Sequence, residues 1–379
     1  MSNREISLIL PSTGDPLILH YWLENLKTYR HLVSNVFISI DTMGKLDPME
    51  YLFIENHIRR QISRHPGIRE NINFLLHQHG HNINNLLEKF GPDLKDNILV
   101  MEEDDYILNP DQLKKAIDTH FDDNYDVTGY SRGCCSEFIT QKTQEVVNSR
   151  SDLFVYRPNR ELNGEFNFWP TLLLLRKDLL MKSSRNFGAR TWYKGETIKF
   201  WDKEYTLTED AAGDTLVSFS LELYNNPSVK RMHMLGDVYH SRLEDSFAIP
   251  PILSTSINFH VGSLSTILAN RFWKPHTSLD HHGYIQFLRD MKKDGETESY
   301  RHSLLEYYRR LSLLQQMLYS LKTPKNFEFF ANYEKNIFET LELIEADHDL
   351  DKIFPTFGIE AIANGFDVSV YSKVFKQMI

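Results

Sequence analysis

Short apolar segments alternate with helix-like segments through the first 110 residues of this 379-residue chain. Residues 6–10, 36–40, 72–77 and 98–101 are largely apolar runs of strand length, and several of the segments between them repeat apolar residues at helical spacing. Strands separated by helices form βαβ units, whose strands pair in parallel and whose helices cover the faces of the sheet. The alternation therefore predicts an α/β fold with a mostly parallel sheet flanked by helices.

The last of these strands runs directly into four consecutive carboxylates, Glu102, Glu103, Asp104 and Asp105. Adjacent like charges repel one another unless a cation or basic groups compensate them. Hard cations such as Mg²⁺ and Mn²⁺ take oxygen ligands, and often bind through one or two carboxylates and the phosphates of a substrate. The run predicts either a metal-bound diphosphate at the carboxyl edge of the sheet or a solvated acidic turn before a helix that starts near residues 109–111.

Composition restricts the partners and the compartment. The chain is 41% hydrophobic and 25% charged, which allows a large core, and its net charge of −10 offers no broad basic surface for nucleic acid or anionic membrane. The first residues lack the features of a signal peptide, and no apolar run is long enough to span a bilayer. The two cysteines, Cys134 and Cys135, are adjacent and cannot build a disulfide framework. We therefore expect a cytoplasmic protein without an integral membrane segment.

The pattern changes at about residue 250, beyond which apolar stripes at helical spacing dominate, as in residues 304–321 and 330–344. Such stripes must be covered, either by the α/β core or by a partner subunit. We therefore expect an α/β domain over residues 1–250 and a helical extension over residues 251–379 that packs on it, with a homodimer held by these helices also allowed.

The order of the segments resembles a known enzyme family. A strand ending at Pro11 is followed by a strand ending at Asp41, a loop at residues 80–84, the acidic turn at 103–105, and the triplet at 208–210. This order resembles the GT-A-fold nucleotide-sugar glycosyltransferases, especially the inverting family 2 type, over roughly the first 245 residues. The resemblance implies a Rossmann-like domain that transfers one sugar from a nucleotide-diphosphate sugar, with Mn²⁺ or Mg²⁺ as cofactor. We expect UDP as the nucleotide.

The resemblance also assigns residues to the nucleotide. Pro11, Ser12 and Asp41 would hold the nucleoside, and Gly80 and Asn84 would belong to a loop of small residues that the nucleotide approaches closely. On its own chemistry, Asp41 could accept hydrogen bonds from a ribose or a base, but it equally suits the cap of a helix or turn.

For the metal, the resemblance places the ion on Asp105, with Asp104 near the ribose or the metal and Glu103 in the place of the first acidic residue. The sequence departs from the family pattern here, because Glu-Glu-Asp-Asp contains no strict Asp-x-Asp. His240 would complete the metal shell, and Arg242 would lie near the diphosphate.

Other histidines compete with this assignment. His233 and His260 are alternatives to His240. The histidines that alternate within residues 77–81 could bind zinc if they lay on one face of a strand. Gly80 interrupts that strand, however, and no cysteine lies near it in the sequence, so we interpret the segment as part of the nucleotide loop.

The triplet Thr208-Glu209-Asp210 resembles the family's Thr-Glu-Asp motif, which implies a catalytic role for Glu209 and Asp210. In an inverting transferase, Asp210 would be the base that deprotonates the acceptor hydroxyl. The same triplet also suits the N-cap of a helix that starts at Thr208, and both roles can hold together.

Four aromatic residues near these motifs could stack on sugar or base faces, or could simply belong to the core: Phe166, Phe168, Trp169 and Trp192.

Two other functions stay open. A nucleotidyltransferase would need a glycine-rich basic loop after the first strand, and residues 11–16 contain no Lys or Arg. A non-catalytic nucleotide- or glycan-binding protein on the same scaffold is disfavoured by the presence of Asp105 and Asp210. The acceptor stays open among a glycan, a protein side chain and a hydroxymethylated nucleic-acid base.

Overall fold

The computed structural model describes residues 4–12, 16–41, 58–60, 62–73, 79–131, 135–157, 166–235, 239–240 and 257–260. Contacts between Cα atoms divide the chain into two units, and most described residues belong to the first, which comprises Met1–Gly14, Asn25–Tyr239 and Ser254–His260. Apart from residues 257–260, the predicted helical extension lies outside the described residues. Three of those four residues, Asn258–His260, form a strand of the first unit, although they follow the predicted boundary at residue 250.

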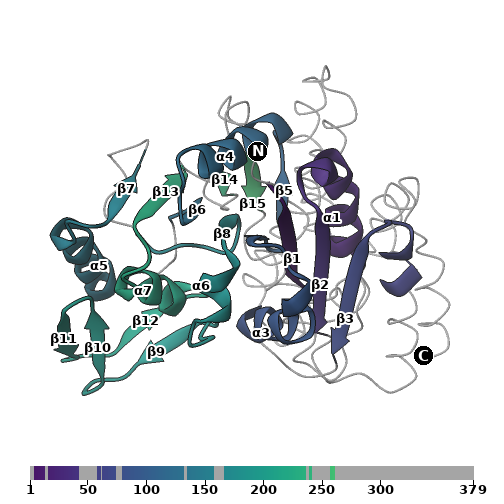
Figure 1. Ribbon diagram of the computed structural model, residues 1–379. Coiled ribbons are helices and arrows are strands. Elements are labelled where there is room, and N and C mark those ends of the chain that lie inside the picture. Colours follow the sequence, from purple (N-terminus) through teal and green to yellow (C-terminus); the bar gives the residue numbers. More distant parts are fainter. Residues whose placement is uncertain are drawn as a thin grey trace, which may run out of the picture. The chain divides into compact units, whose positions relative to one another are not determined.

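An eight-stranded sheet forms the centre of the first unit (Figure 1), in the order β3-β2-β1-β4-β8-β6-β13-β7. Its strands are β1 (Ile6–Ser12), β2 (Asn35–Asp41), β3 (Ile68–Asn73), β4 (Asn97–Val100), β6 (Val127–Tyr130), β7 (Phe154–Tyr156), β8 (Leu173–Arg176) and β13 (Arg231–Leu235). Neighbouring strands are parallel, except that β8 runs antiparallel to β4 and β6. The mostly parallel sheet confirms the predicted α/β class.

Three small sheets complete the described strands. The first pairs β10 (Thr197–Phe200) with β11 (Lys203–Thr206), the second pairs β9 (Arg190–Trp192) with β12 (Ala211–Gly213), and the third has the order β14 (Tyr239–His240), β15 (Asn258–His260) and β5 (Asp105–Ile107).

The described helices are α1 (Pro16–Tyr29), α3 (His79–Phe90), α4 (Pro110–Asp122), α5 (Glu137–Ser149), α6 (Lys177–Met181) and α7 (Val217–Asn225), with short 3₁₀ turns at Arg30–Leu32 and Gly91–Asp93. Helix α3 packs on β1 and β2, α4 on β6, and α5 against α7. None of the described helices has the length and apolar character needed to cross a membrane.

Helix α4 begins where the sequence predicts. Asn109 has an extended backbone and caps the helix, because its side chain accepts a hydrogen bond of 3.2 Å from the backbone nitrogen of Gln112. Pro110 occupies the first helical position, where its missing N–H costs nothing, and Asp111 complements the helix dipole.

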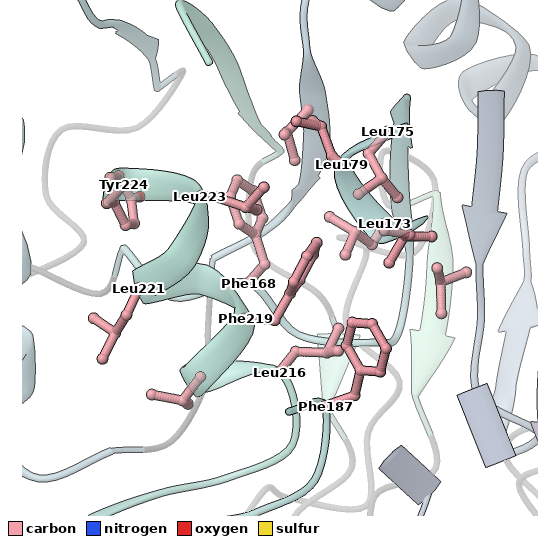
Figure 2. Packing of buried hydrophobic residues seen from close by; sticks show 14 of the residues in the cluster. Phe168, Leu173, Leu175, Leu179, Phe187, Leu216, Phe219, Leu221, Leu223 and Tyr224 are labelled. Carbon is pink, nitrogen blue, oxygen red and sulfur yellow. The ribbon is translucent and has the colours of Figure 1, made fainter. Parts of the chain in front are cut away.

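Residues of β8, α7 and the segments before and after β8 build a large part of the core (Figure 2). Phe187 and Phe219 meet edge to face, with ring centroids 5.2 Å apart. Phe168 is fully buried in the same cluster, and Phe166, Trp169 and Trp192 are each less than a tenth exposed. The interpretation of these four aromatic residues as core residues is therefore the correct one.

Two buried histidines lie between α4 and the sheet. Nδ1 of His120 lies 2.9 Å from Oγ1 of Thr128, and the ring of His233 contacts those of Tyr125 and Tyr156 at centroid distances of 5.0 and 5.3 Å. Burial, and to a lesser extent the nearby His233, lowers the pKa of His120 from 6.5 to about 4. Burial also lowers the pKa of His233, against a smaller opposing effect of the Asp123 carboxylate.

We expect His120 to make the protein sensitive to acid. The unfolded chain binds a proton near pH 6.5, whereas the folded chain resists it down to about pH 4, so stability present above pH 6.5 is lost as the pH falls between these values. The loss from His120 alone is about 3 kcal/mol at pH 4. Urea unfolding at pH 7 and pH 4 should show a smaller loss for His120→Gln than for the wild-type chain. The same loss in both would contradict the assignment.

Candidate functional site

The acidic turn lies at the carboxyl end of β4, beside the end of β1. The hydroxyl of Ser12, the last residue of β1, donates a buried hydrogen bond of 2.5 Å to Oε2 of Glu103. The relative exposures of Glu102, Glu103, Asp104 and Asp105 are 8%, 0%, 3% and 0%. The alternative of a solvated acidic turn is therefore wrong, because all four carboxylate residues are inside the protein.

Strand β5, which begins at Asp105, is held on both sides. The side-chain amide of Asn25 donates to the carbonyl of Ile107 at 2.9 Å and accepts from its N–H at 2.8 Å. On the other side, β15 pairs antiparallel with β5, and the amide of Asn258 donates to Oδ1 of Asp105 at 2.8 Å. These contacts fix both the backbone and the carboxylate of the residue that the resemblance assigns to the metal.

Asn82 connects the ends of β1 and β2. Its amide donates to the carbonyl of Ser12 at 3.1 Å, and its Oδ1 accepts from the Ser39 hydroxyl at 3.4 Å, both in buried positions. The residue lies near the start of α3, so it ties that helix to the same strand ends. Sequence reasoning missed Asn82, Asn25 and Asn258. The signal for Asn82 was its place in an asparagine-rich segment.

The predicted nucleotide loop is wrong in its conformation. Gly80 and Asn84 lie inside α3, which begins at His79. The amide of Asn84 donates to the carbonyl of Arg185 at 3.0 Å, and thereby supports the segment that follows α6. The zinc alternative required a strand through these histidines, and His79 and His81 instead belong to α3.

The other residues that the resemblance assigns to nucleotide binding lie at the ends of strands. Pro11 and Ser12 end β1, and Asp41 ends the neighbouring parallel strand β2, so the three share one edge of the sheet. The side chain of Asp41 lies outside the described part of the structure. The side chain of His240, at the end of β14, and the entire residue Arg242 also lie outside the described part of the structure.

The two alternative histidines differ in position. His260 is the register partner of Asp105 in the pairing of β15 with β5, which places its backbone directly opposite the acidic turn. His233 lies in the middle of β13, and β8 and β6 separate that strand from β4. At about 4.8 Å per strand, three strand spacings amount to about 14 Å. The structure therefore removes His233 from the set of metal candidates.

Oxygen atoms dominate around the acidic turn. Among the described residues, no group of three or more His, Cys, Asp or Glu side chains is arranged so that it could hold a metal ion. A hard cation would thus take carboxylates of the turn as part of its shell and fill the rest with phosphate oxygens and water, as Mg²⁺ commonly does. Oδ1 of Asn258 is buried and has no hydrogen-bond partner in the described structure. Carboxylate and amide oxygens suit Mn²⁺ or Mg²⁺.

Asp210 lies in a different part of the chain from the acidic turn, directly before β12. Asp210 is exposed, and its Oδ1 accepts a hydrogen bond of 2.8 Å from the backbone nitrogen of Lys194. Glu209 is exposed beside it. Helix α7 begins only at Val217, so the helix cap predicted at Thr208 is wrong.

Strand β12 is attached to the segment that follows the carboxyl end of β6. Gly213 forms an antiparallel bridge with Cys135, and the backbone nitrogen of Ser136 donates to the carbonyl of Ala212 at 2.8 Å. A Cβ atom on Gly213 would come within 2.8 Å of the Val217 side chain, so this close approach requires glycine. The backbone around Asp210 is thereby fixed.

No protein-family model matches the chain, and no curated protein matches it. Several solved structures are similar to it. A mannosyltransferase from Pyrobaculum calidifontis in complex with GDP-Man and Mn²⁺ is 11% identical, with a TM-score of 0.39 over 95% of this chain and 85% of that one. Glucosyl-3-phosphoglycerate synthase from Mycobacterium tuberculosis, in complex with phosphoglyceric acid, is 10% identical, with a TM-score of 0.34 over 62% and 70%.

A third similar structure is the galactosyltransferase LgtC in complex with donor and acceptor sugar analogues. It is 12% identical, with a TM-score of 0.27 over 47% of this chain and 60% of that one.

Proposed function

We propose that this chain is a metal-dependent glycosyltransferase that moves one sugar from a UDP-sugar to an acceptor hydroxyl with inversion at the anomeric carbon. The observation that carries the proposal is the burial of residues 102–105 at the carboxyl end of a central strand, next to the end of β1. Ligands of open α/β sheets bind at this edge. Buried carboxylates there would repel a diphosphate unless a cation lay between them.

Three of the four acidic residues then have a role. Asp105 and Glu103 would hold Mn²⁺ or Mg²⁺, and Asp104 would lie near the ribose or the metal. The resemblance adds His240 to the metal shell and Arg242 to the diphosphate. The bound cation would stabilise the negative charge that develops on the departing diphosphate.

Asp210 would be the general base. The acceptor oxygen attacks the anomeric carbon from the side opposite the diphosphate, while the bond between that carbon and the diphosphate oxygen breaks and its electron pair leaves with the diphosphate. The acceptor proton passes to the Asp210 carboxylate. The N–H of Lys194 donates to one oxygen of this carboxylate and orients it, and the second oxygen would take the proton.

We expect UDP to bind at least about tenfold more tightly with Mn²⁺ than in EDTA, a difference of about 1.4 kcal/mol or more. Isothermal titration calorimetry measures both affinities. Asp105→Asn should behave like the EDTA sample, because it keeps the shape of the side chain and removes its charge. Asp111→Asn is the matched control, since Asp111 is exposed in the first turn of α4. Equal UDP affinities with Mn²⁺ and in EDTA would refute the metal assignment.

A further inference from the structure

We infer that Asn258 positions Asp105 for the cation and supplies an oxygen ligand of its own, so that β15 completes the cation site of the acidic turn. The inference rests on the proposed function and deepens it, because it adds an amide oxygen to a site whose other proposed ligands are carboxylates of the turn and His240. It also brings in a strand that follows the acidic turn by about 150 residues.

The contact between Asn258 and Asp105 determines which way the amide points. Nδ2 of Asn258 lies 2.8 Å from Oδ1 of Asp105. An amide nitrogen only donates and a carboxylate oxygen only accepts, so the reversed amide would set two acceptors against each other. The amide oxygen therefore points away from the Asp105 oxygen that the nitrogen binds.

The amide oxygen is the observation that points to a ligand. Asn258 is fully buried, and its Oδ1 has no hydrogen-bond partner within the described structure. Buried polar atoms in folded proteins are nearly always satisfied by protein, water or ions. An amide oxygen is a ligand that Mg²⁺ and Mn²⁺ accept, and a cation at the acidic turn would satisfy it.

The backbone holds Asn258 in place independently of its side chain. The register pairs Asn258 with Ile107 and His260 with Asp105. Because Asp105 lies two residues from the partner of Asn258, both side chains face the same side of the ribbon. The carbonyl of Ile257 also accepts hydrogen bonds of 2.9 and 3.1 Å from the backbone nitrogens of Leu108 and Asn109. Replacing the Asn258 side chain should therefore leave the strand pairing intact.

The test uses the full-length chain and measures binding of Mn²⁺ in the presence of saturating UDP, by electron paramagnetic resonance of the free ion. Asn258→Leu removes both the donor to Asp105 and the amide oxygen, and should weaken Mn²⁺ binding about tenfold.

Asn258→Asp sets a second carboxylate against Asp105, so it should melt at a lower temperature than wild type in EDTA. Addition of Mn²⁺ should then raise the Tm of Asn258→Asp by more than it raises the Tm of wild type, because the cation relieves the repulsion between the two carboxylates.

Asn225→Leu is the matched control. The Asn225 side chain accepts from the backbone nitrogen of Trp201 and donates to the carbonyl of Lys199, so this variant makes the same substitution and loses at least as many hydrogen bonds as Asn258→Leu. Its Mn²⁺ affinity should equal that of wild type. The inference would be overturned if Asn258→Leu bound Mn²⁺ as tightly as wild type does. It would also be overturned if Mn²⁺ raised the Tm of Asn258→Asp by no more than it raises the Tm of wild type. If the wild-type chain bound no Mn²⁺, the proposed function itself would fail.

Discussion

Asp210→Asn should lower kcat by about 10²–10⁴-fold, the usual contribution of a general base, while UDP affinity in Mn²⁺ stays at the wild-type value. The asparagine oxygen can still accept the hydrogen bond from the Lys194 nitrogen, so the local backbone keeps its shape. The amide, however, cannot take the acceptor proton. Steady-state turnover of a UDP-sugar measures the first effect, and calorimetry with UDP measures the second.

Asp214→Asn is the control for this variant. Asp214 is exposed shortly after Asp210, and its carboxylate accepts a local hydrogen bond of 2.7 Å from the backbone nitrogen of Thr215. We expect its kcat to be unchanged. Loss of UDP affinity with unchanged turnover in Asp210→Asn would make Asp210 a binding or capping residue. A retained anomeric configuration in the product, determined by NMR, would also refute the role of Asp210 as base.

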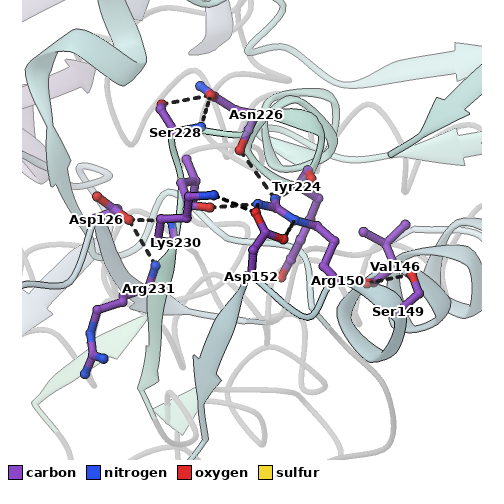
Figure 3. A network of polar contacts seen from close by, with 11 residues as sticks. Asp126, Val146, Ser149, Arg150, Asp152, Tyr224, Asn226, Ser228, Lys230 and Arg231 are labelled. Carbon is purple, nitrogen blue, oxygen red and sulfur yellow. Dashed lines mark hydrogen bonds and ion pairs between the residues drawn. The ribbon is translucent and has the colours of Figure 1, made fainter. Parts of the chain in front are cut away.

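The second large effect concerns stability and the guanidinium of Arg150 (Figure 3), whose side chain is fully buried. It donates to the carbonyls of Tyr224 at 2.8 Å, Asn226 at 3.4 Å and Val229 at 2.9 Å, and it pairs with Asp152 at 3.0 Å. It also lies 4.0 Å from the centroid of the Trp201 ring. One side chain thus connects the end of α5 to the end of α7 and to the segment that leads into β13 (Figure 3).

Arg150→Ala should lower the free energy of unfolding by about 3–5 kcal/mol, because it leaves three carbonyls without their donor and opens a gap beside Trp201. Arg150→Lys should recover little of this loss, since one ammonium cannot reach all the acceptors of a planar guanidinium. Urea unfolding at pH 7 measures both differences.

Arg190→Ala is the matched control for the Arg150 variants. Arg190 also pairs with a carboxylate, at 3.3 Å from Glu196, and also lies over a tryptophan ring, at 5.2 Å from the centroid of Trp192. Its side chain is 45% exposed, so we expect a loss below about 1 kcal/mol. Similar losses for Arg150→Ala and Arg190→Ala would show that burial of the guanidinium contributes little.

The sequence alone determined the features that depend on local pattern. The alternation of apolar runs and helical stripes predicts the mostly parallel sheet, because side-chain periodicity reflects which face of each element is buried. The start of α4 follows from Asn109, Pro110 and Asp111, since a helix cap involves neighbouring residues only. The position of the acidic turn at the end of β4 is likewise a local feature.

The local sequence pattern led to wrong predictions of conformation where the same residue types suit two conformations. The histidine- and asparagine-rich segment that contains Gly80 and Asn84 suits a loop by composition, but it forms the first turns of α3. Thr208 and its acidic neighbours match a helix cap, yet α7 begins only at Val217. In both places the surrounding structure overrides the intrinsic preference of the segment, because propensities are small beside packing energies.

Only the tertiary structure decided the environment of the carboxylates. A run of four acidic residues has the same local pattern in water and in a core, so its burial depends on which distant segments cover it. The residues that fix the turn are Ser12 from β1, Asn25 from α1 and Asn258 from β15, the last of them 153 residues away from Asp105. Hydrogen bonds over such separations leave no periodic signal in a sequence, because they depend on the path of the chain rather than on neighbouring residues.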